Sequence, residues 1–220
     1  MNNSMQAFIF SCVVLGALSS STTSLAMEAQ STIAKRPNIL LIVADDLGFT
    51  DLGSFGGEIE TPHLDKLAMG GLRLTNFHTA PTCSPTRAML LSGVDNHLAG
   101  LGNMAELLTP NQQGKPGYEG YLNFRVVSAA NLLRDVGYRT YMAGKWHLGK
   151  TKETGPSARG FDKSFALLEG GGSHFNHAGL IENSRAHYRE DGNAVELPDN
   201  FYSSDFYTDR IIDNIESGRG

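Results

Sequence analysis

The sequence is poor in cysteine, in positive charge and in long apolar runs. It has two cysteines, 18 Lys and Arg against 23 Asp and Glu, and a formal net charge of −5. A chain without a basic excess gives no electrostatic reason to expect a nucleic-acid partner. With 40% hydrophobic and 19% charged residues, the composition is that of an ordinary globular protein with enough apolar side chains for a sizeable core.

Charged side chains are absent from residues 1–26. Residues 7–18 are mostly apolar, a length typical of a signal-peptide core and too short to span a bilayer, and Ser24 and Ala26 fit a signal-peptidase site. We therefore expect residues 1–26 to be a signal peptide and residues 27–36 a polar leader. The protein would be exported, periplasmic or secreted, with no stable membrane insertion after cleavage. A poorly cleaved membrane tether is the alternative.

Removal of such a peptide would take away Cys12 and leave Cys83 as the only cysteine. A lone cysteine cannot form an internal disulfide, and a free thiol is a liability in an oxidising compartment. Cys83 is therefore either a buried, inert side chain or a residue that is chemically converted. The residues next to Cys83 in the sequence distinguish between these two interpretations.

Strand and helix patterns alternate along the chain and predict an α/β domain with a mostly parallel sheet. The run 38–44 lies between Pro37 and Asp45 and predicts a strand buried on both faces. Two other expected strands are residues 72–77 and 138–143. The expected helices are residues 62–69, 85–92, 126–136 and 205–215, the last with Ile211 and Ile212 on its inner face. Loops are expected at 95–124 and at 150–200, where the glycines at 170–172 form a break.

Three polar residues, Asp45, Cys83 and Lys145, each follow a predicted strand. Because functional groups in such domains gather beyond the carboxyl ends of the strands, we expect these three to converge. Asp45 and Asp46 are adjacent carboxylates that repel each other unless a cation neutralises them. Oxygen ligands of this kind suit Ca²⁺ or Mg²⁺, although a solvated turn is the alternative interpretation.

Two short motifs carry further chemistry. In the run 83–87, Cys-Ser-Pro-Thr-Arg, the proline favours a first helical turn whose free N–H groups attract anions near Cys83, and Arg87 adds a positive charge one turn later. In the run 144–149, Gly-Lys-Trp-His-Leu-Gly, Lys145 and His147 are two residues apart and would point to the same side of an extended segment. An ammonium and an imidazole beside an anion site suit anion binding and proton transfer.

In order and spacing these motifs resemble the type I sulfatases. The run 83–87 matches their C-x-P-x-R signature, whose cysteine is oxidised after translation to formylglycine, and the runs 44–48 and 144–149 resemble their metal and lysine–histidine motifs. Shorter runs resemble bacterial arylsulfatases and alkylsulfatases, at residues 56–57, 61–62, 115–118 and 201–205. The resemblance covers residues 36–215. It implies an alkaline-phosphatase-like α/β/α sandwich, incomplete in this chain, with one Ca²⁺ and hydrolysis of sulfate monoesters.

The resemblance also implies a role for each motif residue. Asp45, Asp46 and the modified Cys83 would bind the metal, after a formylglycine-generating enzyme has converted the cysteine. The hydrated aldehyde, a geminal diol, would attack sulfur with one hydroxyl, and loss of a proton from the other would expel sulfate. The remaining catalytic residues would be Arg87, which fixes the diol, Lys145, which holds a sulfate oxygen, and His147, which assists breakdown of the diol.

Part of the sulfatase pattern has no match before Gly220. A later Asp-Asn or Asp-Gln pair, a further histidine and a further lysine are not found, so residues 37–220 are expected to be the N-terminal part of a catalytic domain. His174 and His177 are interpreted as loop residues rather than replacements. Two alternatives remain open: a phosphonate monoester hydrolase or phosphodiesterase of the same superfamily, and a truncated fragment without catalysis.

Overall fold

The computed structural model describes residues 36–218, and residues 36–43 form a unit separate from the rest of the chain. The expected signal peptide and all but the last residue of the expected leader lie outside the described residues. Within the described range, no helix combines the length and the apolar character that a membrane crossing requires.

All four predicted helices are present, with shifted ends. They are α1 (Pro62–Gly70), α2 (Cys83–Ser92), α3 (Ala129–Asp135) and α4 (Ser203–Ser217), together with the 3-10 helices η1 (Gly53–Phe55), η2 (Ala105–Leu107) and η3 (Ser157–Arg159). Local signals set their ends. Gly93, with a left-handed φ of 69°, ends α2 and donates its N–H to Met89 O at 2.8 Å. Ser128 caps the N-terminus of α3, where its Oγ accepts from Asn131 N at 3.0 Å.

The sheet contains four strands in the order β1-β2-β3-β4: β1 (Tyr141–Lys145), β2 (Lys163–Leu167), β3 (Tyr188–Glu190) and β4 (Asn193–Val195). Strands β1 and β2 are parallel, whereas the β2–β3 and β3–β4 pairs are antiparallel. The α/β class is confirmed, but this sheet is mixed rather than mostly parallel. The expectation of loop throughout 150–200 is also wrong, because three of the four strands lie there.

The strands expected at 38–44 and 72–77 are not formed. Both segments lack regular structure, and neither belongs to the one sheet of the described residues. The side chains of residues 39–43 are 46–71% exposed, and Leu72 and Phe77 are also largely exposed. An apolar run becomes a buried strand only where neighbouring strands supply hydrogen bonds and covered faces, and nothing in the described residues supplies them here.

Both faces of β2 are covered. Ala166 points into one hydrophobic cluster and Phe165 into another, as the alternation of side chains along a strand requires. The first cluster joins the sheet to α2 and to the segment after β1, and its buried members are Ala88, Ala99, Leu101, Leu122, Trp146, Leu148, Ala166 and Leu168. The sheet therefore has packed side chains on both sides, and the first of these clusters anchors the residues that follow β1.

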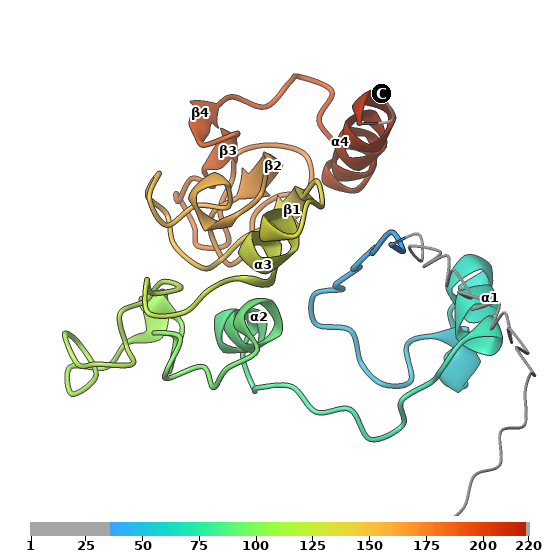
Figure 1. Cartoon of the computed structure of the whole chain (residues 1–220), viewed down its shortest axis with the longest axis horizontal. Coiled ribbons are helices and arrows are strands. Elements are labelled where there is room, and N and C mark those ends of the chain that lie inside the picture. The colour runs from blue at the N-terminus through green and yellow to red at the C-terminus, as the bar shows by residue number, and fades with distance from the viewer. Residues whose placement is uncertain (1–35, 219–220) are drawn as a thin grey trace, which may run out of the picture. The chain divides into compact units, whose positions relative to one another are not determined.

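Helix α4 covers the second face and lies beside β1 and β2 in Figure 1. The rings of Phe206 and Tyr207 lie 4.8 and 6.1 Å from the ring of Phe165. The inner face of α4 therefore begins with these two aromatic residues. Ile211 is partly buried but Ile212 is exposed, so the expectation that both isoleucines face inward is only half correct.

Candidate functional site

Asp45, Asp46 and Cys83 come together although they are far apart in the sequence. One potential ligand atom from each of the three lies within 4.8 Å of the other two. Cys83 is the first residue of α2 and is partly buried, whereas both aspartates are exposed. Asp46 has a φ of 55°, an unusual backbone conformation for a residue other than glycine. The predicted convergence is confirmed, but it arises without the strands that were expected before Asp45 and Cys83.

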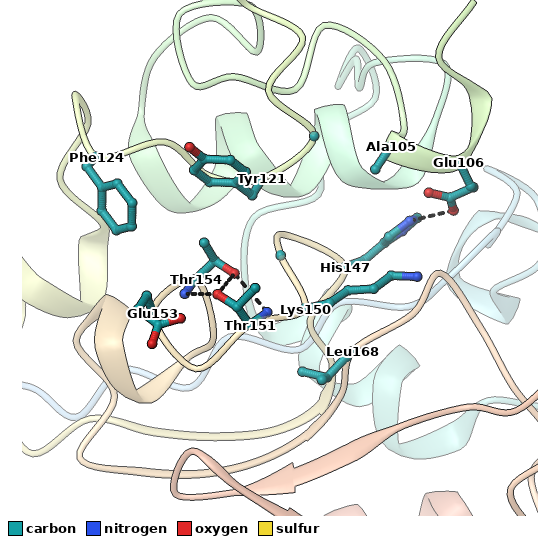
Figure 2. A pocket seen from close by; sticks show the side chains of 12 residues that line it. Ala105, Glu106, Tyr121, Phe124, His147, Lys150, Thr151, Glu153, Thr154 and Leu168 are labelled. Atoms are coloured by element: carbon teal, nitrogen blue, oxygen red, sulfur yellow. Dashed lines mark hydrogen bonds and ion pairs between the residues drawn. The ribbon is translucent and has the colours of Figure 1, made fainter. Parts of the chain in front are cut away.

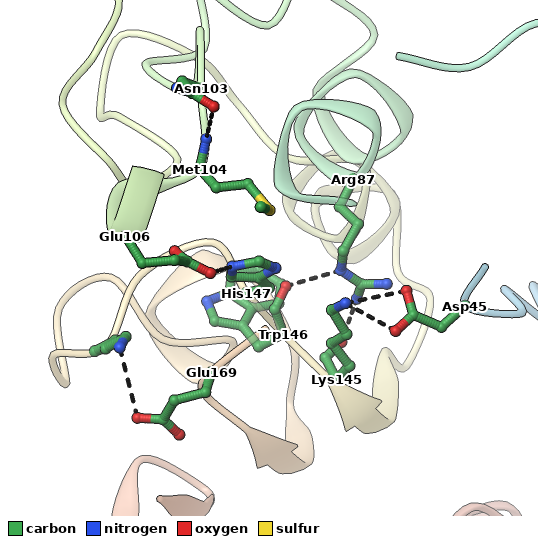
Figure 3. Close-up of polar contacts among 10 residues, drawn as sticks. Asp45, Arg87, Asn103, Met104, Glu106, Lys145, Trp146, His147 and Glu169 are labelled. Carbon is green, nitrogen blue, oxygen red and sulfur yellow. Dashed lines mark hydrogen bonds and ion pairs between the residues drawn. The ribbon is translucent and has the colours of Figure 1, made fainter. Parts of the chain in front are cut away.

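Lys145 joins this cluster from the last position of β1 (Figure 3). Its Nζ donates to Asp45 Oδ1 at 3.0 Å and to Oδ2 at 2.9 Å. The Lys145 side chain is 12% exposed and that of Asp45 is 55% exposed. The largely buried Lys145 side chain therefore holds its ammonium against the same exposed carboxylate that was predicted to bind a metal.

Arg87 connects α2 to the end of β1. Its Nε donates to Trp146 O at 2.9 Å, and its Nη2 donates to Lys145 O. Burial lowers the pKa of the Arg87 guanidinium, while the nearby Asp45 and Cys83 oppose that shift. Arg87 thus fixes the backbone on which Lys145 stands and keeps a positive charge close to Cys83.

His147 lies just beyond β1 in a left-handed backbone conformation, with a φ of 54°. Its neighbours Trp146 and Leu148 are fully buried, and its own side chain is 5% exposed. Its Nε2 lies 2.8 Å from Glu106 Oε1 (Figure 3). Lys145 and His147 were predicted to point to the same side because an extended backbone was assumed. The extended backbone ends before His147, and the two side chains contact different carboxylates, Asp45 and Glu106.

The protonation of His147 is controlled by opposing effects. Burial lowers the pKa of His147 most strongly, and the negative charge and hydrogen bond of Glu106 oppose this. Lys145 and Arg87 lower the pKa further. The neutral imidazole is therefore favoured at neutral pH, which is the form that accepts a proton.

A cavity of about 440 Å³ opens beside His147 (Figure 2). Of the residues predicted from the sequence for catalysis or metal binding, only His147 lines it. The rings of Tyr121 and Phe124, 5.9 Å apart, contribute to its wall. Its full lining is Ala105, Glu106, Gly120, Tyr121, Phe124, His147, Gly149, Lys150, Thr151, Glu153, Thr154 and Leu168.

Glu106 is the residue of this site that the sequence did not reveal. It lies 41 positions before His147, in a region predicted only as a long loop. No local motif connects the two residues, so the contact could be found only from the tertiary structure.

His174 and His177 form structural contacts. The Nδ1 of His174 lies 2.6 Å from Ser203 Oγ at the start of α4. His177 accepts from Leu197 N at 3.0 Å through Nε2, and its Nδ1 lies 3.1 Å from Ala186 O. Neither histidine lines the cavity beside His147. These contacts support the interpretation of both as loop residues.

Known proteins with similar sequences are named as sulfatases. The chain is 51% identical to an uncharacterized sulfatase of Schizosaccharomyces pombe over 195 residues, covering 84% of this chain and 35% of that protein. It is 45% identical to the arylsulfatase of Klebsiella aerogenes over 186 residues, covering 83% of this chain and 40% of that protein. The chain therefore spans 35 to 40% of the length of these relatives.

A solved structure and a family model agree with these relatives. The crystal structure of the PsFucS1 sulfatase from Pseudoalteromonas sp. matches with a TM-score of 0.60 and 26% identity, covering 80% of this chain and 39% of that one. The model of the family described as Sulfatase matches residues 37–219. This chain belongs to the sulfatase family.

Proposed function

We propose that this protein is an arylsulfatase-type sulfuric ester hydrolase that cleaves sulfate monoesters at the cluster of Asp45, Asp46 and Cys83. The observation that carries the proposal is the approach of these three potential ligands to within 4.8 Å, with Lys145 in contact with Asp45. The arylsulfatase name of the Klebsiella relative supports an aryl sulfate as the first substrate to test.

The ligand chemistry of the cluster supports Ca²⁺, provided that Cys83 is converted. Ca²⁺ binds oxygen rather than sulfur, so a cysteine thiol is a poor third ligand beside two carboxylates. Oxidation of Cys83 to formylglycine by a formylglycine-generating enzyme would replace the sulfur with oxygen. Asp45, Asp46 and residue 83 would then hold one Ca²⁺, and water, substrate or other ligands would complete its six to eight positions. Bound there, the ion would neutralise charge on the sulfate group and on the attacking oxygen.

The residues around the cluster have complementary roles in this proposal. Lys145 would exchange part of its contact with Asp45 for a sulfate oxygen when substrate enters. Arg87 would hold the end of β1 through two backbone carbonyls and add positive charge near residue 83. His147, neutral because it is buried, would accept a proton from the hydroxyl group of residue 83. The apolar and aromatic cavity beside His147 would receive the organic part of the ester.

The same proposal includes the course of maturation. Residues 1–26 would direct export and be removed, 27–36 would form a leader, and 37–220 would be the N-terminal part of the catalytic domain. A periplasmic or secreted protein would meet its sulfate esters outside the cytoplasm.

The test compares turnover of p-nitrophenyl sulfate with turnover of an aryl phosphodiester. The protein is produced together with a formylglycine-generating enzyme, and Cys83→Ala is the control that removes the proposed nucleophile. Faster turnover of the sulfate, dependent on Cys83 and Ca²⁺, is expected. Faster turnover of the phosphodiester would favour the phosphonate monoester hydrolase or phosphodiesterase alternative, and turnover of neither would favour the non-catalytic one.

A further inference from the structure

In the hydrogen bond between Glu106 and His147, the imidazole is the donor and the carboxylate the acceptor. A glutamate that is ionised only accepts hydrogen bonds, so the Nε2 of His147, 2.8 Å from Glu106 Oε1, must carry the proton. The other ring nitrogen, Nδ1, is buried and has no hydrogen-bond partner among the described residues. A buried N–H without a partner is costly, and in the neutral ring with Nε2–H the Nδ1 atom is a lone pair instead.

Glu106 lies on the short helix η2, whose turn is closed by two hydrogen bonds. The Nδ2 of Asn103 donates to Leu107 O at 2.9 Å, and Leu107 N donates to Met104 O at 3.0 Å. These hydrogen bonds span the turn on which Glu106 stands, and Figure 3 shows its carboxylate directed at the imidazole. The backbone of Glu106 is therefore held within its own turn, while its side chain is 39% exposed and contacts His147 through Oε1.

Gly170 packs against both members of the pair. A Cβ added at this position would lie 2.7 Å from His147 Cε1 and 3.0 Å from Glu106 Oε1. These distances are too short for an alanine side chain, so one or both partners would have to move. The absence of a side chain at residue 170 thus lets the carboxylate and the imidazole approach each other.

From this geometry we propose that Glu106 is a positioning residue that holds His147 as the Nε2–H tautomer, with the Nδ1 lone pair left to accept a proton during hydrolysis. The proposed use of Nδ1 rests on the proposed sulfatase function, whereas the tautomer does not. Fixing the second ring nitrogen with a carboxylate is a general way to set the tautomer and orientation of a functional imidazole.

The two predictions of this proposal have separate measurements. In the neutral wild-type protein labelled with ¹⁵N-histidine, His147 is expected to show a protonated Nε2 and an unprotonated Nδ1, with its signals assigned by their loss in His147→Gln. Glu106→Ala is expected to lower kcat by roughly 10- to 100-fold with a much smaller change in KM. Glu106→Gln keeps an acceptor oxygen, so it should retain the tautomer and more of the activity.

The pH profile gives a third readout. Besides burial, three charged groups shift the pKa of His147: Glu106, Lys145 and Arg87. Glu106 raises the His147 pKa, so loss of its charge in Glu106→Gln should move the pH-profile limb that reports His147 to lower pH. Glu182→Gln is the control, because it removes an exposed carboxylate that does not line the cavity and should leave the limb in place.

Gly170→Ala leaves both side chains chemically intact and tests their approach. Altered His147 nitrogen shifts together with reduced kcat would support the proposal. A wild-type His147 protonated on Nδ1, or a Glu106→Ala protein whose tautomer is unchanged, would overturn it whether or not the protein turns over sulfate esters. Full turnover in Glu106→Ala would also overturn the positioning role, even if the wild-type protein has His147 protonated on Nε2. Absence of turnover in the wild-type protein would instead refute the proposed sulfatase function.

Discussion

At the scale of single residues, two members of the candidate site have strained backbones. Asp46 and His147 have φ values of 55° and 54°. For a residue other than glycine, this left-handed backbone conformation costs about 1–2 kcal/mol of conformational free energy. Such strain persists where the surrounding structure imposes it, and it often marks functional positions. The left-handed backbone at His147 turns its imidazole toward Glu106, whereas Lys145, two residues earlier, contacts Asp45.

Arg87 offers a test at the same scale. Arg87→Lys removes the forked guanidinium that reaches both Trp146 O and Lys145 O, and one ammonium cannot replace it. We expect the free energy of unfolding, measured with urea, to fall by about 1.5–3 kcal/mol. Arg134→Lys, at the exposed end of α3, should change it by less than about 0.5 kcal/mol. Equal losses in the two variants would show that the Arg87 contacts do not stabilise the fold.

At the scale of elements, the helices could be predicted from local signals, whereas of the three expected strands only the one at 138–143 is present, as β1 with shifted ends. Pro62 at the start of α1 and Gly93 after α2 act within their own turns, so the sequence indicates them directly. The apolar run 38–44 has the composition of a buried strand, but strands depend on distant partners that composition does not specify. Strand β2 was missed although the short apolar stretch 165–168 was a usable signal.

The residues of the candidate site also fall into those that local sequence predicts and those that only the tertiary structure brings together. Residues 83–87 and 144–149 could be identified because each motif is continuous in the sequence. The partner of His147 could not, because Glu106 reaches it through the packing of a long loop against the end of β1. The same holds for the ion pair of Lys145 and Asp45, which joins residues 100 positions apart.

Gly160 tests the packing of elements. It precedes β2 with a φ of 101°, and a Cβ there would lie 2.4 Å from Asn131 N in α3. Gly160→Ala should therefore lower the free energy of unfolding by roughly 2–4 kcal/mol, through backbone strain and overpacking. Gly114→Ala is the control, because Gly114 also has a positive φ of 67° but faces open space. Thermal or urea unfolding giving the two variants equal stability would contradict the predicted clash with α3.

At the scale of the whole molecule, Ca²⁺ binding should couple to folding. In protein whose Cys83 has been converted, the folded chain brings Asp45 and Asp46 to residue 83 and the unfolded chain does not, so Ca²⁺ should favour the folded state. At a free concentration of 100 times Kd, the expected stabilisation is about 2.7 kcal/mol, measured by unfolding with and without Ca²⁺. Chelation should reverse it.

Two variants show whether that stabilisation comes from the cluster. Asp45→Asn should lose most of the Ca²⁺-dependent difference, and Glu58→Gln, an exposed carboxylate of the same segment, should retain it. Comparing each variant with and without Ca²⁺ cancels the separate effect of losing the Lys145 ion pair. A Ca²⁺ effect that survives unchanged in Asp45→Asn would assign the ion to another site.

The central claim is that Cys83 is the precursor of the nucleophile, and the mass of its peptide tests it most directly. The protein is produced with a formylglycine-generating enzyme, digested, and measured before and after reaction with an aldehyde-reactive hydrazide. We predict a peptide in which the thiol-bearing side chain has become an aldehyde, together with its hydrazone after reaction. A peptide that retains an unmodified thiol in a preparation that hydrolyses sulfate esters would contradict the claim.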